Sequence, residues 1–265
     1  MARYEDIIRE RRELLKAHNY GDIPEEKWKE SDQKKGVAPP PLEKRYDESR
    51  KLVELVSLEN FSVGKVPLIK ALANRKSRRV FTNEAISMEE LSFLLWATQG
   101  VRMVDEKRAQ TKRVVPSGGG CQPYETYLLI NRVHDIDRGV YRYLPIEHKL
   151  ILVTKNLPEA EELMNKAWFQ NFIGRSAVVF AWAAIPYRTE WRYSSRSYKD
   201  ILIEAGHICQ NLYLACEAIG AGTCAIANYN QEQLDSLLQI DGEDEMTVYL
   251  SAVGKLGKND MGLNQ

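Results

Sequence analysis

The stretch from Tyr198 to Ile219 limits the fold more than any other part of this 265-residue sequence. Its apolar residues have helical spacing, but they nearly encircle the predicted helix (Ile201, Leu202, Ile203, Ala205, Ile208, Leu212, Leu214 and Ala215). Because an apolar helix surface needs another surface to cover it, we expect this helix to be central and buried. The apolar run from Ala177 to Ala183 before it is typical of a strand buried on both faces.

Shorter patterns complete an α+β fold with a central mixed or antiparallel sheet flanked by helices. A helix is expected to begin after Pro67 and to run into the basic residues that follow, and Ser87-Met-Glu-Glu90 is a capping box before a helix that ends at Gly100. The charged stretch 102–113 is expected to be a mobile loop. The remaining predicted elements are strands at 125–131, 139–143, 150–153, 223–228 and 246–253, and helices at 157–168 and 231–238.

The first 64 residues read as an arm and a linker, and residues 65–265 as the main domain. Residues 4–19 predict an amphipathic helix that needs another surface, and the polar stretch after it closes with Pro39-Pro-Pro41, which favours extended backbone. An arm followed by such a strap suits contact with a neighbour, so we expect it to wrap a second subunit.

Composition excludes several classes of function. The 37 basic and 37 acidic residues cancel, which argues against nucleic-acid binding. No apolar run approaches the ~18 residues of a membrane helix, and no secretory segment is visible, so a cytoplasmic protein is expected. The four cysteines and four histidines show no metal-ligand spacing, so we expect neither zinc nor a disulfide. His207 is expected to be a buried core imidazole.

The segment Asn74-Arg-Lys-Ser-Arg-Arg-Val-Phe81 is a candidate anion site. If the preceding helix closes at Lys76, Arg75 and Arg79 project from one face, and Ser77 adds a hydroxyl donor between them. Guanidinium groups hold phosphate through paired hydrogen bonds, and Lys76 adds a further cation. The alternative is a solvated basic helix end favoured by the helix dipole.

Two glycine-rich segments are further candidates. Pro116-Ser-Gly-Gly-Gly120 cannot be regular structure, and its glycines permit close backbone approach or positive φ. Gly220-x-Gly-Thr-Cys224 follows the long helix. The alternatives are an ordinary turn for the first segment and a helix C-cap for the second.

Taken together, these segments, with Gly206-His207 and Asn211-Leu-x-Leu214, resemble the nitroreductase family of flavin enzymes over about residues 65–255. Within that family, the residues of these motifs resemble those of the SagB-type dehydrogenases, which include azoline oxidases. The resemblance implies FMN at the interface of a domain-swapped type of homodimer. It implies that Arg75, Ser77 and Arg79 hold the phosphate, the ribityl chain and the pyrimidine edge. Pro116, Ser117, Gly118 and Gly119 would pack on the isoalloxazine from the partner. Gly220, Gly222, Thr223 and Cys224 would lie beside N5, and Lys255, or alternatively Lys258, would contact phosphate.

The segment 188–199 is the candidate substrate-side element. It carries Arg188, Arg192 and Arg196 at four-residue steps, which share a face if the segment is one helix. Peptide-oxidising relatives place a Lys-Tyr pair of bases where this chain has Arg192-Tyr193. An arginine cannot accept a proton, which argues against azoline oxidation, although Tyr193 or Tyr198 can act as an acid. The alternative is a surface lid.

Three functions follow from this resemblance. The first is an FMN oxidoreductase that takes hydride from NAD(P)H or another donor and passes electrons to a second substrate in ping-pong order. The second is a biosynthetic dehydrogenase of a peptide or small-molecule ring. The third is a flavin-holding regulatory homodimer without catalysis.

Overall fold

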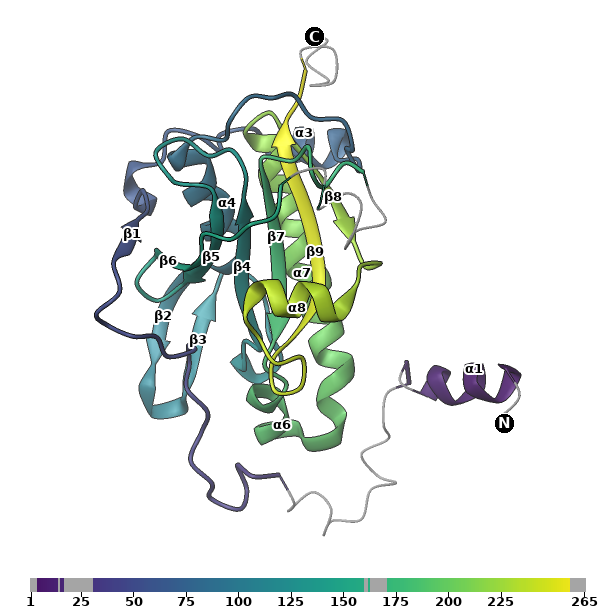
Figure 1. The fold of residues 1–265 in the computed structure, drawn as a ribbon. Coiled ribbons are helices and arrows are strands. Elements are labelled where there is room, and N and C mark those ends of the chain that lie inside the picture. The colour runs from purple at the N-terminus through teal and green to yellow at the C-terminus, as the bar shows by residue number, and fades with distance from the viewer. Residues whose placement is uncertain (1–3, 14, 17–30, 160–161, 163–170, 258–265) are drawn as a thin grey trace.

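A seven-stranded sheet forms the centre of the molecule in the computed structural model, which describes residues 4–13, 15–16, 31–159, 162 and 171–257 (Figure 1). Its strand order is β1-β6-β5-β4-β7-β9-β8, and every neighbouring pair is antiparallel. The strands are β1 (Leu52–Glu54), β4 (Tyr124–Ile130), β5 (Gly139–Leu144), β6 (Lys149–Thr154), β7 (Val178–Ala184), β8 (Ala221–Ile226) and β9 (Met246–Lys255). The predicted α+β class with an antiparallel sheet is confirmed.

Helices cover both faces of this sheet, as Figure 1 shows. Two helices pack together on one face, α4 (Met88–Gln99) and α7 (Ser197–Ala218), and α8 (Gln231–Leu238) lies on the other. The remaining helices are α1 (Tyr4–Glu13), α3 (Leu68–Asn74) and α6 (Tyr187–Tyr193), with 3-10 turns η2 (Leu58–Asn60), η3 (Glu106–Arg108), η4 (Gly118–Gly120) and η6 (Ser194–Arg196). No helix among the described residues is long and apolar enough to cross a membrane.

Strand β7 separates two apolar cores, as its continuous apolar sequence predicts. Phe180 and Trp182 point into the core under α4 and α7, whereas Val179 and Ala181 point into the core on the side of α8. Alternation of side chains along the strand places neighbours on opposite faces. All seven residues of β7 are buried. The predicted helix 157–168 lies largely outside the described residues.

Helix α7 lies against the centre of the sheet, but a single chain covers only one of its sides. Ile201 and Leu212 are buried, while Leu202 and Ile203 are 60% and 46% exposed. His207 is exposed on the uncovered side, so its prediction as a buried core residue is wrong for the single chain. Apolar periodicity shows that a helix needs cover, but it does not show whether the same chain supplies it.

The prediction of a mobile loop at 102–113 is wrong. Strands β2 (Val101–Asp105) and β3 (Gln110–Arg113) form a separate antiparallel hairpin. Arg113 is buried and donates from Nη1 to Gln99 Oε1 at 2.7 Å. Burial lowers the pKa of Arg113 to about 10. The charged residues misled the prediction because part of this charge, that of Arg113, is buried and hydrogen-bonded to neutral groups inside the protein.

The described part of the arm contacts its own chain. Residues 31–46, which we call the strap, run along α6 and across the sheet, and β1 pairs with β6 at the edge of the sheet. The backbone at 37–41, which includes the three prolines, has no helix, as predicted. The division at residue 64 and contact of the arm with a second subunit stay predictions.

The capping box at Ser87 gives a stability prediction. Ser87 Oγ accepts from Glu90 N at 3.1 Å, and Glu90 Oε2 accepts from Ser87 N at 2.9 Å. Ser87→Ala should lower the free energy of unfolding by about 0.5–2 kcal/mol, measured by urea denaturation, because one helix N–H loses its partner. Ser236→Ala, at an exposed position within α8, is the control and should change it by less than about 0.5 kcal/mol. An equal change in both variants would contradict the capping role.

Candidate functional site

The basic segment after α3 is extended and not helical. Helix α3 ends at Asn74, and Ser77 forms a parallel bridge with Thr223 of β8. Arg78 N donates to Thr223 O at 2.9 Å, so the segment covers the outer edge of β8. Arg75 and Arg79 therefore share a face because side chains alternate in extended backbone, and not because they lie one helical turn apart.

The two sides of this extended segment differ in their partners. Arg78 is buried and pairs with Glu217 at 3.3 Å. Lys76 N donates to the same carboxylate, so the backbone of Lys76 contributes to this anchor. On the other side, Arg75 and Arg79 form no ion pair with any carboxylate in the described residues. The anchoring contacts thus leave two guanidiniums available to an anion.

Tyr213 of α7 organises the exposed side. Its hydroxyl lies 2.9 Å from Ser77 Oγ and accepts from Ala225 N at 2.9 Å. The Arg75 guanidinium lies over the Tyr213 ring at 5.4 Å from its centroid. Either hydroxyl can donate in the contact between Tyr213 and Ser77, and when Tyr213 donates, the Ser77 hydrogen is free for a ligand.

Residues 220–224 lie beside this segment, but most of their side chains have structural roles. A Cβ at Gly222 would come within 2.6 Å of Arg78 Cβ, so glycine is needed for this close approach. Thr223 Oγ1 is buried and contacts Ser251 Oγ at 2.7 Å, and Cys224 is 2% exposed in the core. Gly220 has φ 65° and follows α7.

Lys255 lies near the same cluster, because it pairs with Ala221 across the sheet. Its ammonium is bound to Glu90 Oε1 at 2.6 Å. Lys258 lies outside the described residues. Arg75 and Ser77 thus lie at Tyr213 and Lys255 lies at Ile219, both toward the C-terminal end of α7, whereas the Arg79 guanidinium lies over the Phe172 ring.

Residues 116–120, which we call the glycine loop, lie at the other end of α7. Gly119 and Gly120 have φ 59° and 68°, a region that favours glycine. Gly118 N donates to Glu204 Oε1 at 2.7 Å, and Gln110 Nε2 donates to Gly119 O at 2.6 Å. The amide of Gly118 is therefore already satisfied within the chain, and contacts on both sides fix the backbone of the loop.

The predicted catalytic residues separate into two places. Arg192 Nη1 donates to Gly119 O, and a Cβ on Gly119 would lie 2.5 Å from Tyr193 Oη. Tyr198 instead lines a cavity of about 690 Å³ together with Glu190, which raises the pKa of the Tyr198 hydroxyl. Arg192 and Tyr193 of α6 thus contact the glycine loop, whereas Tyr198 lines a separate cavity.

The three arginines of this segment do not form a common face. Helix α6 ends at Tyr193, and Ser194 has φ 52° and ψ −136°, which separates α6 from α7. Arg188 is buried against Glu125 at 2.6 Å. Arg188 thus lies in a buried ion pair and Arg192 beside the glycine loop, and the segment is not the single helix on which a shared arginine face depended.

The two groups of candidate residues do not meet in one chain. Gly118 contacts Glu204, whereas Ser77 contacts Tyr213 and Arg78 contacts Glu217 on the same helix. At 1.5 Å per residue, Glu204 is separated along α7 from Tyr213 by roughly 14 Å and from Glu217 by roughly 20 Å. The chain holds two halves of the predicted site, one at each end of its longest helix.

Sequence reasoning did not identify several residues of these halves. Glu204, Tyr213 and Glu217 are polar positions within the predominantly apolar α7, which was the available signal because buried polar groups require partners. Gln110 carried no comparable signal, since it lies in the stretch expected to be a loop.

Comparison with known proteins agrees with this geometry. Residues 72–255 match the Nitroreductase family model. A protein of Methanocaldococcus jannaschii assigned by name to the nitroreductases is 30% identical over 193 residues, which cover 73% of this chain and 93% of that protein. The chain belongs to the nitroreductase family, and the class of protein that this family defines is a flavin-associated oxidoreductase.

Two further comparisons extend this result. A crystal structure from Ralstonia eutropha assigned to the nitroreductases superposes with a TM-score of 0.65 at 25% identity, covering 84% of this chain and 96% of that one. The trifolitoxin-processing protein TfxB of Rhizobium leguminosarum bv. trifolii is 27% identical over 138 residues. That match covers 49% of this chain and only 36% of TfxB.

The carboxyl group of Glu204 gives a pH prediction. Burial raises its pKa to about 7 from the model-peptide value of 4.5, with Asp200 adding to the shift and the Gly118 amide, Ser117 and Arg113 opposing it. A raised pKa means that the fold loses stability as pH rises from about 4.5 to 7, where the unfolded chain releases this proton first. Glu204→Gln should therefore gain up to about 3 kcal/mol over wild type across that interval, measured by denaturation at each pH.

The control for this prediction is Glu232→Gln, which changes an exposed carboxylate at the start of α8. Its stability difference from wild type should stay flat across the same interval. A flat difference for Glu204→Gln would show that this carboxyl titrates normally in the fold.

Proposed function

We propose that this chain is an FMN-dependent oxidoreductase that acts as a homodimer. The observation that carries the proposal is the alignment of Arg75, Ser77 and Arg79 on one side of an extended segment, where neither guanidinium has a carboxylate partner among the residues that the structure describes. A cluster of like charges without partners is costly unless an anion answers it. A phosphate-bearing flavin supplies such an anion.

The residues present fit FMN in chemical terms. Arg75, Ser77, Arg79 and Lys255 would hold the phosphate, ribityl and pyrimidine groups, since each presents a donor. Lys255 must share its ammonium with Glu90 in this role. Backbone groups of Gly220, Gly222, Thr223 and Cys224 lie beside these residues, which fits a place next to the ring.

The separation of the two halves supports the homodimer. Gly118 and Ser77 contact α7 at Glu204 and Tyr213, roughly 14 Å apart along the helix, so in one chain they lie at different places along it. A twofold pair of chains can place the loop of one protomer against the basic segment of the other and complete two equivalent sites. The uncovered side of α7, with Leu202 and Ile203 exposed, offers apolar surface for such a contact.

FMN, when bound, supplies the hydride chemistry of the reaction at its N5 atom. The chain's own contribution is position and charge. Arg192 is fixed against Gly119 O and keeps a permanent cation beside the loop, while Tyr193 is the neighbouring group able to donate a proton. NAD(P)H is the proposed hydride donor, and the second substrate is a small molecule or a peptide.

The second candidate function is oxidation of a ring or C–C bond in a biosynthetic pathway, which the likeness to TfxB favours. Mixing the protein anaerobically with NADH or NADPH in a stopped-flow instrument separates the two. Rapid bleaching of flavin absorbance near ~450 nm supports the reductase, and its absence supports a pathway-specific donor. Flavin retained without turnover on any donor or acceptor would indicate a regulatory flavin-binding homodimer.

The first prediction concerns FMN affinity. Arg75→Ala should weaken FMN binding by about 1.5–3 kcal/mol, or roughly tenfold or more, because a charge-assisted hydrogen bond is lost. Fluorescence titration of the flavin-free protein measures this change. Lys70→Ala, which removes an exposed cation from α3, is the control and should leave affinity within about twofold. Unchanged affinity in Arg75→Ala would remove this residue from the site.

The second prediction concerns the shared site. Arg75→Ala disables the basic half and Gly119→Ala strains the loop half through its positive φ and the contact with Tyr193. Unfolding and refolding the two variants together should recover about a quarter of wild-type activity, because half of the dimers are mixed and each contains one intact site. Each variant refolded alone is the control. Absence of recovery in the mixture would contradict a site built from two protomers.

A further inference from the structure

Helix α6 is too short to be stable by its own hydrogen bonds. It contains seven residues, and isolated helices well below ~12–15 residues are marginal in water. It is followed directly by Ser194, whose φ of 52° is unfavourable for a residue other than glycine. The position of α6, and with it the position of Arg192, must therefore be set by contacts with other parts of the chain.

The strap supplies contacts along one side of α6. Gln33 N donates to Trp191 O at 2.9 Å, and Trp191 Nε1 donates to Val37 O at 2.9 Å. Tyr187 Oη donates to Asp32 Oδ2 at 2.9 Å. The strap thus binds both ends of a helix that has only two turns.

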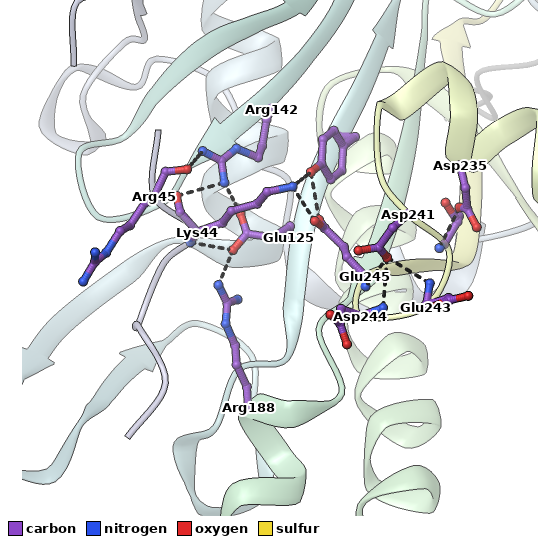
Figure 2. A network of polar contacts seen from close by, with 12 residues as sticks. Lys44, Arg45, Glu125, Arg142, Arg188, Asp235, Asp241, Glu243, Asp244 and Glu245 are labelled. Carbon is purple, nitrogen blue, oxygen red and sulfur yellow. Dashed lines mark hydrogen bonds and ion pairs between the residues drawn. The ribbon is translucent and has the colours of Figure 1, made fainter. Parts of the chain in front are cut away.

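A buried ion network then joins the same strap to the sheet and to α6 (Figure 2). Glu125 of β4 accepts from Lys44 N at 3.1 Å, from Arg188 Nη2 at 2.6 Å and from Arg142 Nη1 at 3.3 Å. Arg142 also donates to the carbonyls of Lys44 and Arg45. Glu125, Arg142 and Arg188 are each less than 5% exposed, so this junction is shielded from water and salt.

A neighbouring face of α6 contacts the glycine loop. Arg192 donates to Gly119 O, Tyr193 fills the space where a Gly119 side chain would lie, and Arg188 Nη1 donates to Gln122 O at 3.4 Å. Gln122 N in turn donates to Ser117 Oγ at 2.9 Å. Helix α6 is therefore held between the strap and the loop.

We propose that the strap, residues 31–46, is a positioning brace for the glycine loop, acting through α6 and Arg192. The brace keeps the loop ordered so that it can receive the flavin, and this consequence rests on the proposed function. Tyr187 and Trp191 are positioning residues in this scheme, since they contact the strap and reach the loop only through α6. Three consecutive prolines suit this use, because an extended segment with few alternative conformations loses little entropy when it docks.

The test uses the full chain with the paired substitutions Tyr187→Phe and Trp191→Phe, which remove two hydrogen bonds to the strap and keep aromatic packing. Amide hydrogen exchange of peptides spanning 116–122 is measured in the flavin-free protein. We expect at least threefold faster exchange than in wild type. The matched control is Tyr229→Phe, which loses one hydrogen bond to Thr247 O away from the loop and should leave this exchange unchanged.

A double-mutant cycle shows whether the effect passes through Arg192. Arg192→Gln alone should also accelerate exchange of the loop, and adding Tyr187→Phe and Trp191→Phe to it should produce little further change. A merely structural role of the strap predicts independent effects that multiply. Multiplying effects, or exchange of 116–122 equal to wild type in the paired variant, would overturn the brace.

Flavin titration of the same proteins separates this proposal from the proposed function. We expect the paired variant to bind FMN at least threefold more weakly than wild type and Tyr229→Phe to bind it equally well. Coupled exchange in a wild-type protein that binds no FMN would sustain the brace and sink the flavoenzyme. FMN binding that is equal in wild type and the paired variant, with unaltered exchange, would sustain the flavoenzyme and sink the brace.

Discussion

A single buried carboxylate, that of Glu125, joins parts of the chain that are far apart in sequence. Burial alone would raise the pKa of this group, but the guanidiniums of Arg188 and Arg142 outweigh burial and hold the pKa below its usual value. Loss of the carboxylate would leave two cations without their partner in the interior, which is far more costly than loss of an exposed pair. The strap, the sheet and α6 therefore all depend on the same buried charge, that of the Glu125 carboxylate.

The length of α7 is the second constraint on the site. The same helix anchors the loop through Glu204 and the basic segment through Tyr213 and Glu217, so it fixes the distance between the two halves. A straight, packed helix cannot bring its own ends together. In the proposed homodimer a second chain would complete the site, and the exposed Leu202 and Ile203 lie next to Glu204 at the loop end of α7.

The parts of the fold that could be predicted were those encoded locally. The capping box at Ser87, the buried strand β7 and the helix α7 each depend on residues close in sequence, so spacing alone located them. The hairpin β2–β3 was missed because its charged residues hide a weak alternation, and Arg113 finds its partner in α4. The early end of α3 depends on capture of Ser77 by the edge of β8, which no local pattern records.

The candidate site also combines features that the local sequence encodes with features that depend on distant residues. Its residue types were visible in the sequence, and the structure gathers Arg75, Ser77 and Arg79 on one side of an extended segment. What the sequence could not show was which groups were already engaged. Lys255 is bound to Glu90 and the Gly118 amide to Glu204, and both facts depend on residues distant in the chain. The Glu125 junction was equally hidden, since none of its charges is near another in sequence.

The groups beside the loop favour one kind of chemistry over another. A dehydrogenase that oxidises a ring must remove a proton as well as a hydride, and this requires a base. Arg192 cannot serve as this base, and the carboxylates next to the loop are those of Glu204, whose Oε1 accepts from Gly118 N, and Asp200. A nicotinamide donor releases its hydride without a proton being removed. The pair Arg192-Tyr193 thus offers a cation and a proton donor, which suits the proposed reductase, whereas a base-dependent oxidase would have to use one of the two carboxylates beside Gly118.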